Sequence, residues 1–220
     1  MTPPPAAAGA DRAYRRLALA TIVMTFLLVI IGGIVRVSDS GLGCGPANSG
    51  FHGWPFCNGD LVPGLDLNTI IEYSHRTVAG IVGLMTIALA VLAWRRQRGN
   101  RALVRTAVAA VVVVIAQGLL GPATVGDNLD ELLVAAHLGL AMLFLALTIY
   151  VWRASKAENV GAEPADGGRG FRPLALVAGG LAFCTIVAGG YMAGTQNYGR
   201  ADYQPGGGAP HACGKEVPTR

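Results

Sequence analysis

The sequence predicts an all-α integral membrane protein, in which a four-helix transmembrane bundle is followed by a fifth helix that begins a second, truncated four-helix repeat. Three observations support this prediction. Of the 220 residues, 52% are hydrophobic and only 14% are charged, and the mean hydropathy is +0.47. The apolar residues form uncharged runs long enough to cross a bilayer, which takes about 20 residues. The end of the last run also resembles the end of the first run, which indicates a duplication.

Five apolar runs are the candidate membrane spans. They cover residues 17–35, 77–94 with a polar lead-in from Ile70, 106–125, 132–152 and 174–194. Gly and Ala are frequent within them, as is typical where helices approach one another closely in lipid. The first run resembles the start of a signal peptide. It is long, however, and no small-x-small cleavage site precedes Arg36, so we expect it to be retained as a helix.

Basic residues lie at alternate ends of these spans. They precede the first span, cluster between the second and third, and recur between the fourth and fifth. Cytoplasmic loops carry such an excess, which predicts a cytoplasmic N-terminus, an outer loop at 37–69 and an extracytoplasmic residue 220. The net charge of +4 therefore reflects membrane topology. Because no basic patch has interleaved aromatic residues, we expect no nucleic-acid partner.

The duplication is visible in the motifs that follow the first and fifth spans. Each copy has a glycine pair, a Gly-rich stretch with one cysteine, and then a proline: Gly32-Gly33, Cys44 and Pro55 in the first, and Gly189-Gly190, Cys213 and Pro218 in the second. A four-helix unit duplicated in the same orientation predicts eight spans. The second copy breaks off before its second cysteine, so we expect the chain to be part of a longer parent.

The spans and the duplication set the expected domain boundaries. Residues 1–15 are expected to be a disordered cytoplasmic N-terminus, and residues 16–153 the N-terminal four-helix half. Residues 154–172 then form a cytoplasmic linker. Residues 173–220 contain the first helix and the start of the outer loop of the truncated second half.

Two histidines lie inside the candidate spans, where ionisable groups are costly and are functional candidates. His75 and His137 lie about 8 Å and about 9 Å below the outer ends of their helices at 1.5 Å per residue. Two imidazoles at one depth on different helices are the arrangement that axially ligates a heme iron. The small residues Ala79, Gly83 and Ala141 below them leave room for a flat macrocycle. Alternatively, each histidine hydrogen-bonds a neighbouring helix.

Charged residues surround the first histidine. Glu72 lies one turn before His75, where a carboxylate can relay a proton or accept a hydrogen bond from a substrate. Alternatively, it is an interfacial acid paired with Arg76 or Arg36. The two arginines lie at the outer rim, where guanidinium groups suit heme propionates. They can equally extend to lipid headgroups.

Cys44 and Cys57 both lie in the first outer loop. Disulfides persist outside the plasma membrane, so we predict a bridge between them. The alternative is two free thiols in a Gly-rich loop. A zinc site is disfavoured because only His52 lies between them as a third ligand.

Several motifs together resemble the heme A synthase family. They are Gly32-Gly33-Ile34-Val35-Arg36, residues 38–41 before Cys44, residues 54–59 (WPFCNG), the run from Ile71 through Glu72-Tyr73-Ser74-His75-Arg76 to Gly83, Gly121-x-x-Thr124, and Ala135-Ala136-His137-Leu138. The Glu-Tyr-x-His-Arg run beside the outer cysteine loop is the most specific of these. The resemblance covers the chain from about residue 15 onward.

The resemblance implies an eight-helix oxidoreductase of the bacterial plasma membrane that converts heme O to heme A, oxidising a porphyrin methyl group to a formyl group. It implies that His75 and His137 are axial heme ligands and that Glu72 is the catalytic carboxylate. Cys44 and Cys57 would be a disulfide or redox pair. Heme O would be the substrate of this half, and the heme b of the family's second half would be absent.

Partners implied by the resemblance are heme O, the lipid bilayer, heme O synthase, cytochrome oxidase assembly factors and a second copy in a homo-oligomer. Two alternative functions use the same histidines, namely a membrane protein that stores or hands over heme without oxidising it, and a b-type cytochrome. A quinol-linked di-heme electron carrier is disfavoured because only one level of paired histidines is present.

Overall fold

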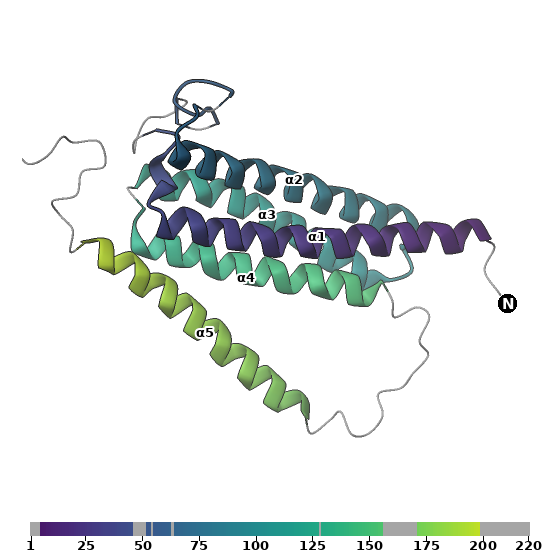
Figure 1. Ribbon diagram of the computed structural model, residues 1–220. Coiled ribbons are helices and arrows are strands. Elements are labelled where there is room, and N and C mark those ends of the chain that lie inside the picture. The colour runs from purple at the N-terminus through teal and green to yellow at the C-terminus, as the bar shows by residue number, and fades with distance from the viewer. Residues whose placement is uncertain are drawn as a thin grey trace, which may run out of the picture.

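Figure 1 shows the computed structural model, in which the first four helices lie side by side in an antiparallel bundle. The structure describes residues 5–45, 52–53, 55–62, 64–127, 129–155 and 171–198. The helices are α1 (Pro5–Val37), α2 (Leu67–Arg96), α3 (Arg101–Gly126), α4 (Glu131–Ala154) and α5 (Phe171–Tyr198), with a short 3-10 helix η1 (Ser40–Leu42) after α1. The all-α prediction is confirmed for these residues.

All five helices are long and apolar enough to cross a membrane by length and composition. Each contains one of the five predicted runs. The expected linker at 154–172 and the tail with Cys213 lie largely or wholly outside the described residues.

α1 extends on the N-terminal side of the predicted span. It begins at Pro5, and residues 5–15 precede the apolar run 17–35 within the same helix. Proline is well tolerated at the first helical position because its missing N–H would have no partner there. The three alanines that follow Pro5 are the strongest helix formers.

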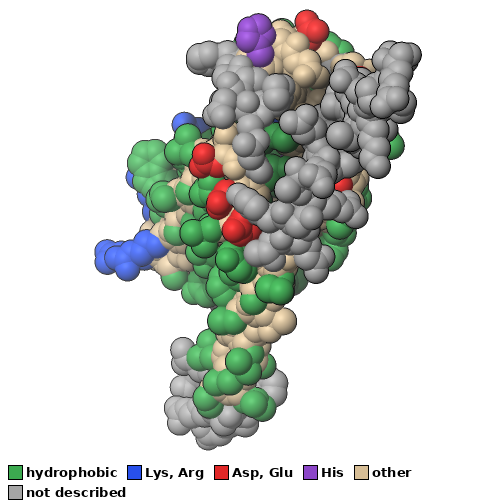
Figure 2. All heavy atoms as spheres, turned by 90° about the vertical axis from the view of Figure 1, so that its left-hand side faces the viewer, with side chains coloured by type: hydrophobic (Ala, Val, Ile, Leu, Met, Phe, Trp, Pro, Cys, Tyr) green, Lys and Arg blue, Asp and Glu red, His purple; other side chains and the backbone are tan. Residues whose placement is uncertain are grey.

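The bundle has two ends that we name by their contents. The disulfide end carries the loop between α1 and α2, and the arginine end is where α2 ends at Arg96 and α3 begins at Arg101. Figure 2 shows the molecule from the disulfide end, with acidic side chains on this face among hydrophobic ones.

Capping interactions fix helix starts at both ends. Asn100 accepts a hydrogen bond from the Leu103 N–H at the start of α3. Asp130 accepts hydrogen bonds from Leu132 and Leu133 at the start of α4. These side chains satisfy backbone donors that a helix start leaves without partners.

The apolar core occupies the part of the bundle away from the disulfide end. The cluster nearest the arginine end comprises Tyr14, Ala18, Leu89, Ala93, Leu103, Ala107 and Val151. A central cluster is formed by Val82, Ala110 and Phe144. Val82 and Phe144 lie two helical turns from His75 and His137, respectively. The two histidines therefore lie in the remaining segment, between this core and the disulfide end.

α5 packs against α4 and diverges from the bundle toward its own N-terminal end (Figure 1). The contact depends on small residues. A Cβ built on Gly139 of α4 would lie 3.1 Å from Cγ2 of Val187, and one built on Gly190 of α5 would lie 2.8 Å from Cδ2 of Leu138. Elsewhere the described side chains of α5 are mostly exposed.

Candidate functional site

His75 on α2 and His137 on α4 lie close enough to interact electrostatically. In both imidazoles the Nδ1 atom is buried and has no hydrogen-bond partner among the residues that the structure describes. Buried polar atoms in folded proteins nearly always have partners, so two such atoms in one region point to a group that the protein atoms do not supply. The alternative of a hydrogen bond from each histidine to a neighbouring helix is not observed at these Nδ1 atoms.

Each histidine ring packs against a glycine of a neighbouring helix. A Cβ built on Gly32 of α1 would lie 3.0 Å from Cε1 of His75. On the other side, a Cβ built on Gly121 of α3 would lie 4.0 Å from Cε1 of His137. At Gly32 a larger side chain would compete with the His75 ring for space, whereas at Gly121 a Cβ would make only an ordinary van der Waals contact with the His137 ring.

Gln117 of α3 is a polar residue near this site that the sequence analysis missed. Its Nε2 donates a hydrogen bond to the backbone carbonyl of His137 at 3.0 Å, and its buried Oε1 has no partner. It lies one turn before Gly121, so one face of α3 contacts both the backbone and the ring of His137. Its position inside a membrane span was the signal that could have identified it.

Glu72 faces the outer loop. Its Oε2 accepts a hydrogen bond from the backbone N–H of Cys44 at 2.7 Å, and its Oε1 forms an ion pair with Arg76. Glu72 is only 4% exposed, so this pair is largely removed from solvent. The pairing with Arg76 that was considered as the alternative for Glu72 is therefore present.

Arg76 extends the same network into the loop. Its guanidinium donates hydrogen bonds to the backbone carbonyls of Gly53 and Phe56 in addition to the pair with Glu72. It also interacts electrostatically with His75, which shows that this network borders the histidine pair. Arg36, the other candidate for propionate binding, lies in the last turn of α1 at the same end of the bundle.

Cys44 and Cys57 form a disulfide, which confirms the predicted bridge. Both are fully buried, at 0% and 1% exposure. The loop is held on the start of α2 by further hydrogen bonds, from Thr69 to the carbonyl of Gly43 at 2.7 Å and from Tyr73 to the carbonyl of Leu61 at 2.9 Å. The disulfide loop and the first turns of α2 therefore form one packed unit.

The site residues suit a bis-histidine heme site better than a metal bound by protein ligands alone. Within the described part of the chain, no group of three or more His, Cys, Asp or Glu residues can hold a metal ion. Two imidazoles on facing helices are sufficient when a porphyrin supplies the other four ligands. A Cβ at Gly83, two turns below His75, would meet no atom within 4 Å, which is consistent with space on this face of α2.

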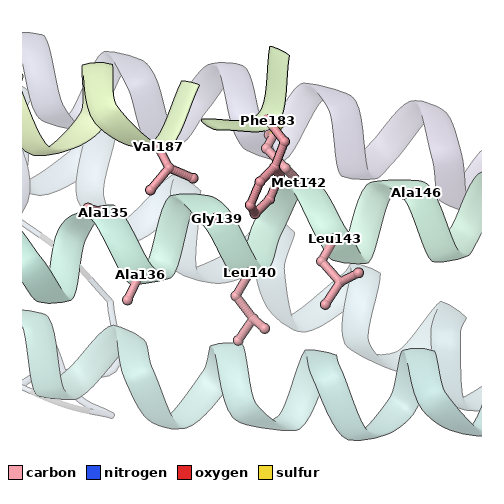
Figure 3. Close-up of a pocket in the computed structure, with 9 residues that line it drawn as sticks. All are labelled: Ala135, Ala136, Gly139, Leu140, Met142, Leu143, Ala146, Phe183 and Val187. Atoms are coloured by element: carbon pink, nitrogen blue, oxygen red, sulfur yellow. The ribbon is translucent and has the colours of Figure 1, made fainter. Parts of the chain in front are cut away.

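An apolar groove of about 420 Å³ lies elsewhere, between α4 and α5 (Figure 3). In Figure 3, Phe183 and Val187 extend from α5 toward α4, whereas Leu140 points away from α5. None of the residues that line this groove is ionisable, and neither histidine is among them. The groove is therefore distinct from the histidine site.

Comparison with known proteins decides the family. Residues 15–69 and 65–208 match the model of the COX15-CtaA family, described as cytochrome oxidase assembly protein. The chain belongs to this family. Heme A synthases of Bacillus licheniformis and Shouchella clausii are 35% and 37% identical to it over 153 and 150 residues, respectively. These alignments cover 68% and 67% of this chain but 49% and 48% of the relatives.

The heme A synthase of Alkalihalophilus pseudofirmus is 31% identical over 187 residues, which cover 81% of this chain and 60% of the relative. This COX15-CtaA family chain thus spans about half to three fifths of the length of these relatives. Family membership and the apolar helices establish it as a multi-pass membrane protein.

The predicted site residues of this COX15-CtaA family member fall into two adjoining groups. His75 and His137 form the histidine pair, while Glu72, Arg76 and the disulfide form the loop network. The groups adjoin because His75 and Arg76 are neighbours in sequence.

Proposed function

We propose that this chain is the substrate-binding half of a heme A synthase, in which heme O is held between His75 and His137. The observation that carries the proposal is the pair of buried imidazoles with unpartnered Nδ1 atoms, each packed against helix backbone. Relatives named heme A synthase match the region that contains both histidines. The reaction proposed for the substrate is the four-electron oxidation of a porphyrin methyl group to a formyl group (R–CH3 + H2O → R–CHO + 4 H+ + 4 e−), which requires an external electron acceptor as co-reactant.

In this proposal the two histidines would hold the heme iron, which would fix the macrocycle relative to the bundle. The apolar core below them excludes water from that side. Arg36 and Arg76, at the disulfide end, are the candidates for binding the two propionates, since guanidinium groups form charge-assisted hydrogen bonds with carboxylates.

We propose that Glu72 is the functional carboxylate of this half. It lies one turn before His75, and its contacts with Arg76 and the Cys44 N–H orient the carboxylate group. The disulfide keeps Cys44 in the position from which its N–H reaches Glu72. Glu72 is thereby coupled to the redox state of the loop.

We also propose that the disulfide end faces the extracytoplasmic side of a bacterial plasma membrane. The last turn of α2 carries Arg95 and Arg96, and the last turn of α4 carries Arg153, all at the opposite end. Basic residues concentrate on the cytoplasmic side, and disulfides persist on the other. Heme O synthase and cytochrome oxidase assembly factors are the proposed protein partners, and self-association is a further proposal.

The test is heme binding by the purified chain. Hemin is titrated into the detergent-solubilised protein, and the spectrum is followed for the six-coordinate, low-spin signature of two imidazole ligands. We expect His75→Ala and His137→Ala each to abolish that signature. His52→Ala, which removes an exposed loop histidine, is the matched control and should bind hemin like the wild type. Unchanged low-spin binding by both bundle variants would overturn the heme site.

A second function, heme binding without oxidation, is favoured by one observation. Both oxygens of Glu72 are engaged by the loop network rather than left available at the histidine pair. The two functions are separated by extracting heme from cells that make heme O and express the chain. Heme A in the extract supports the synthase, whereas bound heme O or heme b without heme A supports a carrier.

A further inference from the structure

The contact between Gly32 and His75 is specific to the imidazole ring. The three heavy atoms nearest to a Cβ built on Gly32 are Cε1, Nδ1 and Nε2 of His75, at 3.0, 3.6 and 3.7 Å. No backbone atom of α2 and no other side chain approaches as closely. The glycine therefore makes room for this ring rather than for close packing of the two helices in general.

The three distances also describe how the ring is oriented. Nδ1 and Nε2 are almost equally far from the Gly32 position, so the Cε1 corner between them points at α1. A contact on this corner opposes any rotation of the imidazole that would turn either nitrogen atom toward α1. A methyl group at residue 32 would lie closer to the ring than about nine in ten observed Cβ contacts, and the ring would have to move by a few tenths of an ångström.

The second histidine is held in a different way. The corresponding distance from Gly121 to Cε1 of His137 is 4.0 Å, an ordinary van der Waals separation. The hydrogen bond from Gln117 instead acts on the His137 backbone carbonyl. The His75 ring is thus restrained directly by its neighbour helix, whereas His137 is restrained mainly through its backbone.

We propose that Gly32 is a positioning residue that sets the orientation of the His75 imidazole, and that the bare α1 backbone at this residue is required for that orientation. The inference rests on the proposed function, in which His75 is a heme ligand. It gives α1 a role in the site although α1 contributes no ligand. It also implies that His75 is more sensitive to substitution of Gly32 than His137 is to substitution of Gly121.

Gly33 provides a matched control, because a Cβ built on it would meet no atom of the described residues within 4 Å. It lies next to Gly32 in the same helix, so substitution changes helix propensity equally at both positions. The experiment compares Gly32→Ala and Gly32→Val with Gly33→Ala and Gly33→Val in the full chain. Hemin affinity, the g values of the ferric low-spin signal and the heme midpoint potential are measured for each variant.

We expect Gly32→Ala to bind hemin roughly tenfold more weakly, a change equivalent to about 1.4 kcal/mol. Its g values should shift because they depend on the relative orientation of the two imidazole planes. Gly32→Val should lose the low-spin signal, whereas both Gly33 variants should match the wild type. Gly121→Ala should have a smaller effect than Gly32→Ala because its methyl group has room.

The alanine variants keep the test decisive if valine disturbs folding, since alanine adds one methyl group and favours the helix. Circular dichroism establishes that each variant is folded. Wild-type g values and affinity in a folded Gly32→Ala would overturn the positioning role while leaving the heme site intact. Absence of hemin binding by the wild-type chain would instead overturn the proposed function itself.

Discussion

α1 and α5 carry the two copies of the repeated glycine motif, yet they lie in different surroundings. α1 packs against α2 and α4, and its inner face includes the fully buried residues Ala18 and Thr21. α5 contacts α4, and none of its most apolar 18-residue segment is buried within the described structure. Within the described structure, similar sequence therefore occurs in one helix that has a buried face within the bundle and in one helix whose apolar segment is not buried, because burial depends on the neighbours and not on the motif.

The paired glycines exchange roles between the two copies. In α1 the first glycine, Gly32, contacts the His75 ring, while Gly33 faces open space. In α5 the first glycine, Gly189, faces open space, while Gly190 packs against Leu138. Adjacent residues point about 100° apart on a helix, so a modest difference in rotation decides which glycine meets a neighbour. The motif thus supplies two possible contact points and the packing selects one.

The largest expected effect comes from breaking the network of Glu72, Arg76 and the Cys44 N–H. This network attaches the loop that follows α1 to α2. Glu72→Leu leaves Arg76 without its carboxylate partner and the Cys44 N–H without its acceptor. Removing one member of a buried pair is strongly destabilising, and we expect a loss of about 3 kcal/mol in the free energy of unfolding. The measurement is chemical or thermal unfolding in detergent.

Glu72→Gln is the graded control, since its amide oxygen can still accept from the Cys44 N–H while its charge is lost. It should lose less stability than Glu72→Leu. Equal stability of wild type and Glu72→Leu would show that the loop network does not hold α1 to α2.

A somewhat smaller effect is expected at Gly43, where the loop crosses the start of α2. A Cβ there would lie 2.5 Å from the backbone oxygen of Asn68, and neither backbone can yield cheaply. We expect Gly43→Ala to cost about 2 kcal/mol through overpacking and to lower the yield of the Cys44–Cys57 disulfide. Unfolding and thiol titration measure the two effects.

Gly64→Ala is the matched control in the same loop, because its Cβ would meet only the Asp66 carboxylate at an ordinary 3.6 Å. It should leave stability and disulfide yield almost unchanged. A Gly43→Ala protein that is as stable as the Gly64→Ala protein would contradict the close approach of the Gly43 and Asn68 backbones.

The smallest effect is expected on the α5 side. Gly190→Ala places a methyl group 2.8 Å from the flexible end of Leu138, which can move, so we expect a cost of at most about 1 kcal/mol. Hydrogen exchange in α5 should become faster as the helix shifts on α4. Gly189→Ala should leave the exchange of α5 unchanged or slower, since alanine favours the helix. If Gly189→Ala instead sped up exchange more than Gly190→Ala did, α5 would be rotated so that Gly189, and not Gly190, faces Leu138 of α4.

Several features of the fold and site followed from local sequence. The five spans, the disulfide and the shared neighbourhood of His75 and His137 were predicted because hydropathy and helical periodicity are local properties. The expected domain boundaries stay predictions. The sequence identified neither the partner nor the role of Gln117, because its partner is the backbone of another helix; its polar side chain within a membrane span was the one local signal.

By itself, the sequence determined the class of the protein and its membrane-spanning helices, and it singled out His75 and His137 as the proposed heme ligands, since each depends on composition and spacing along one helix. Only the tertiary structure decided that Gly32, and not Gly33, contacts His75, and that Glu72 turns toward Cys44 and Arg76. The physical reason is that spacing along the chain defines the faces of each helix but not its rotation against its neighbours. That rotation is set by packing of the whole bundle, and with it the environment of each functional side chain.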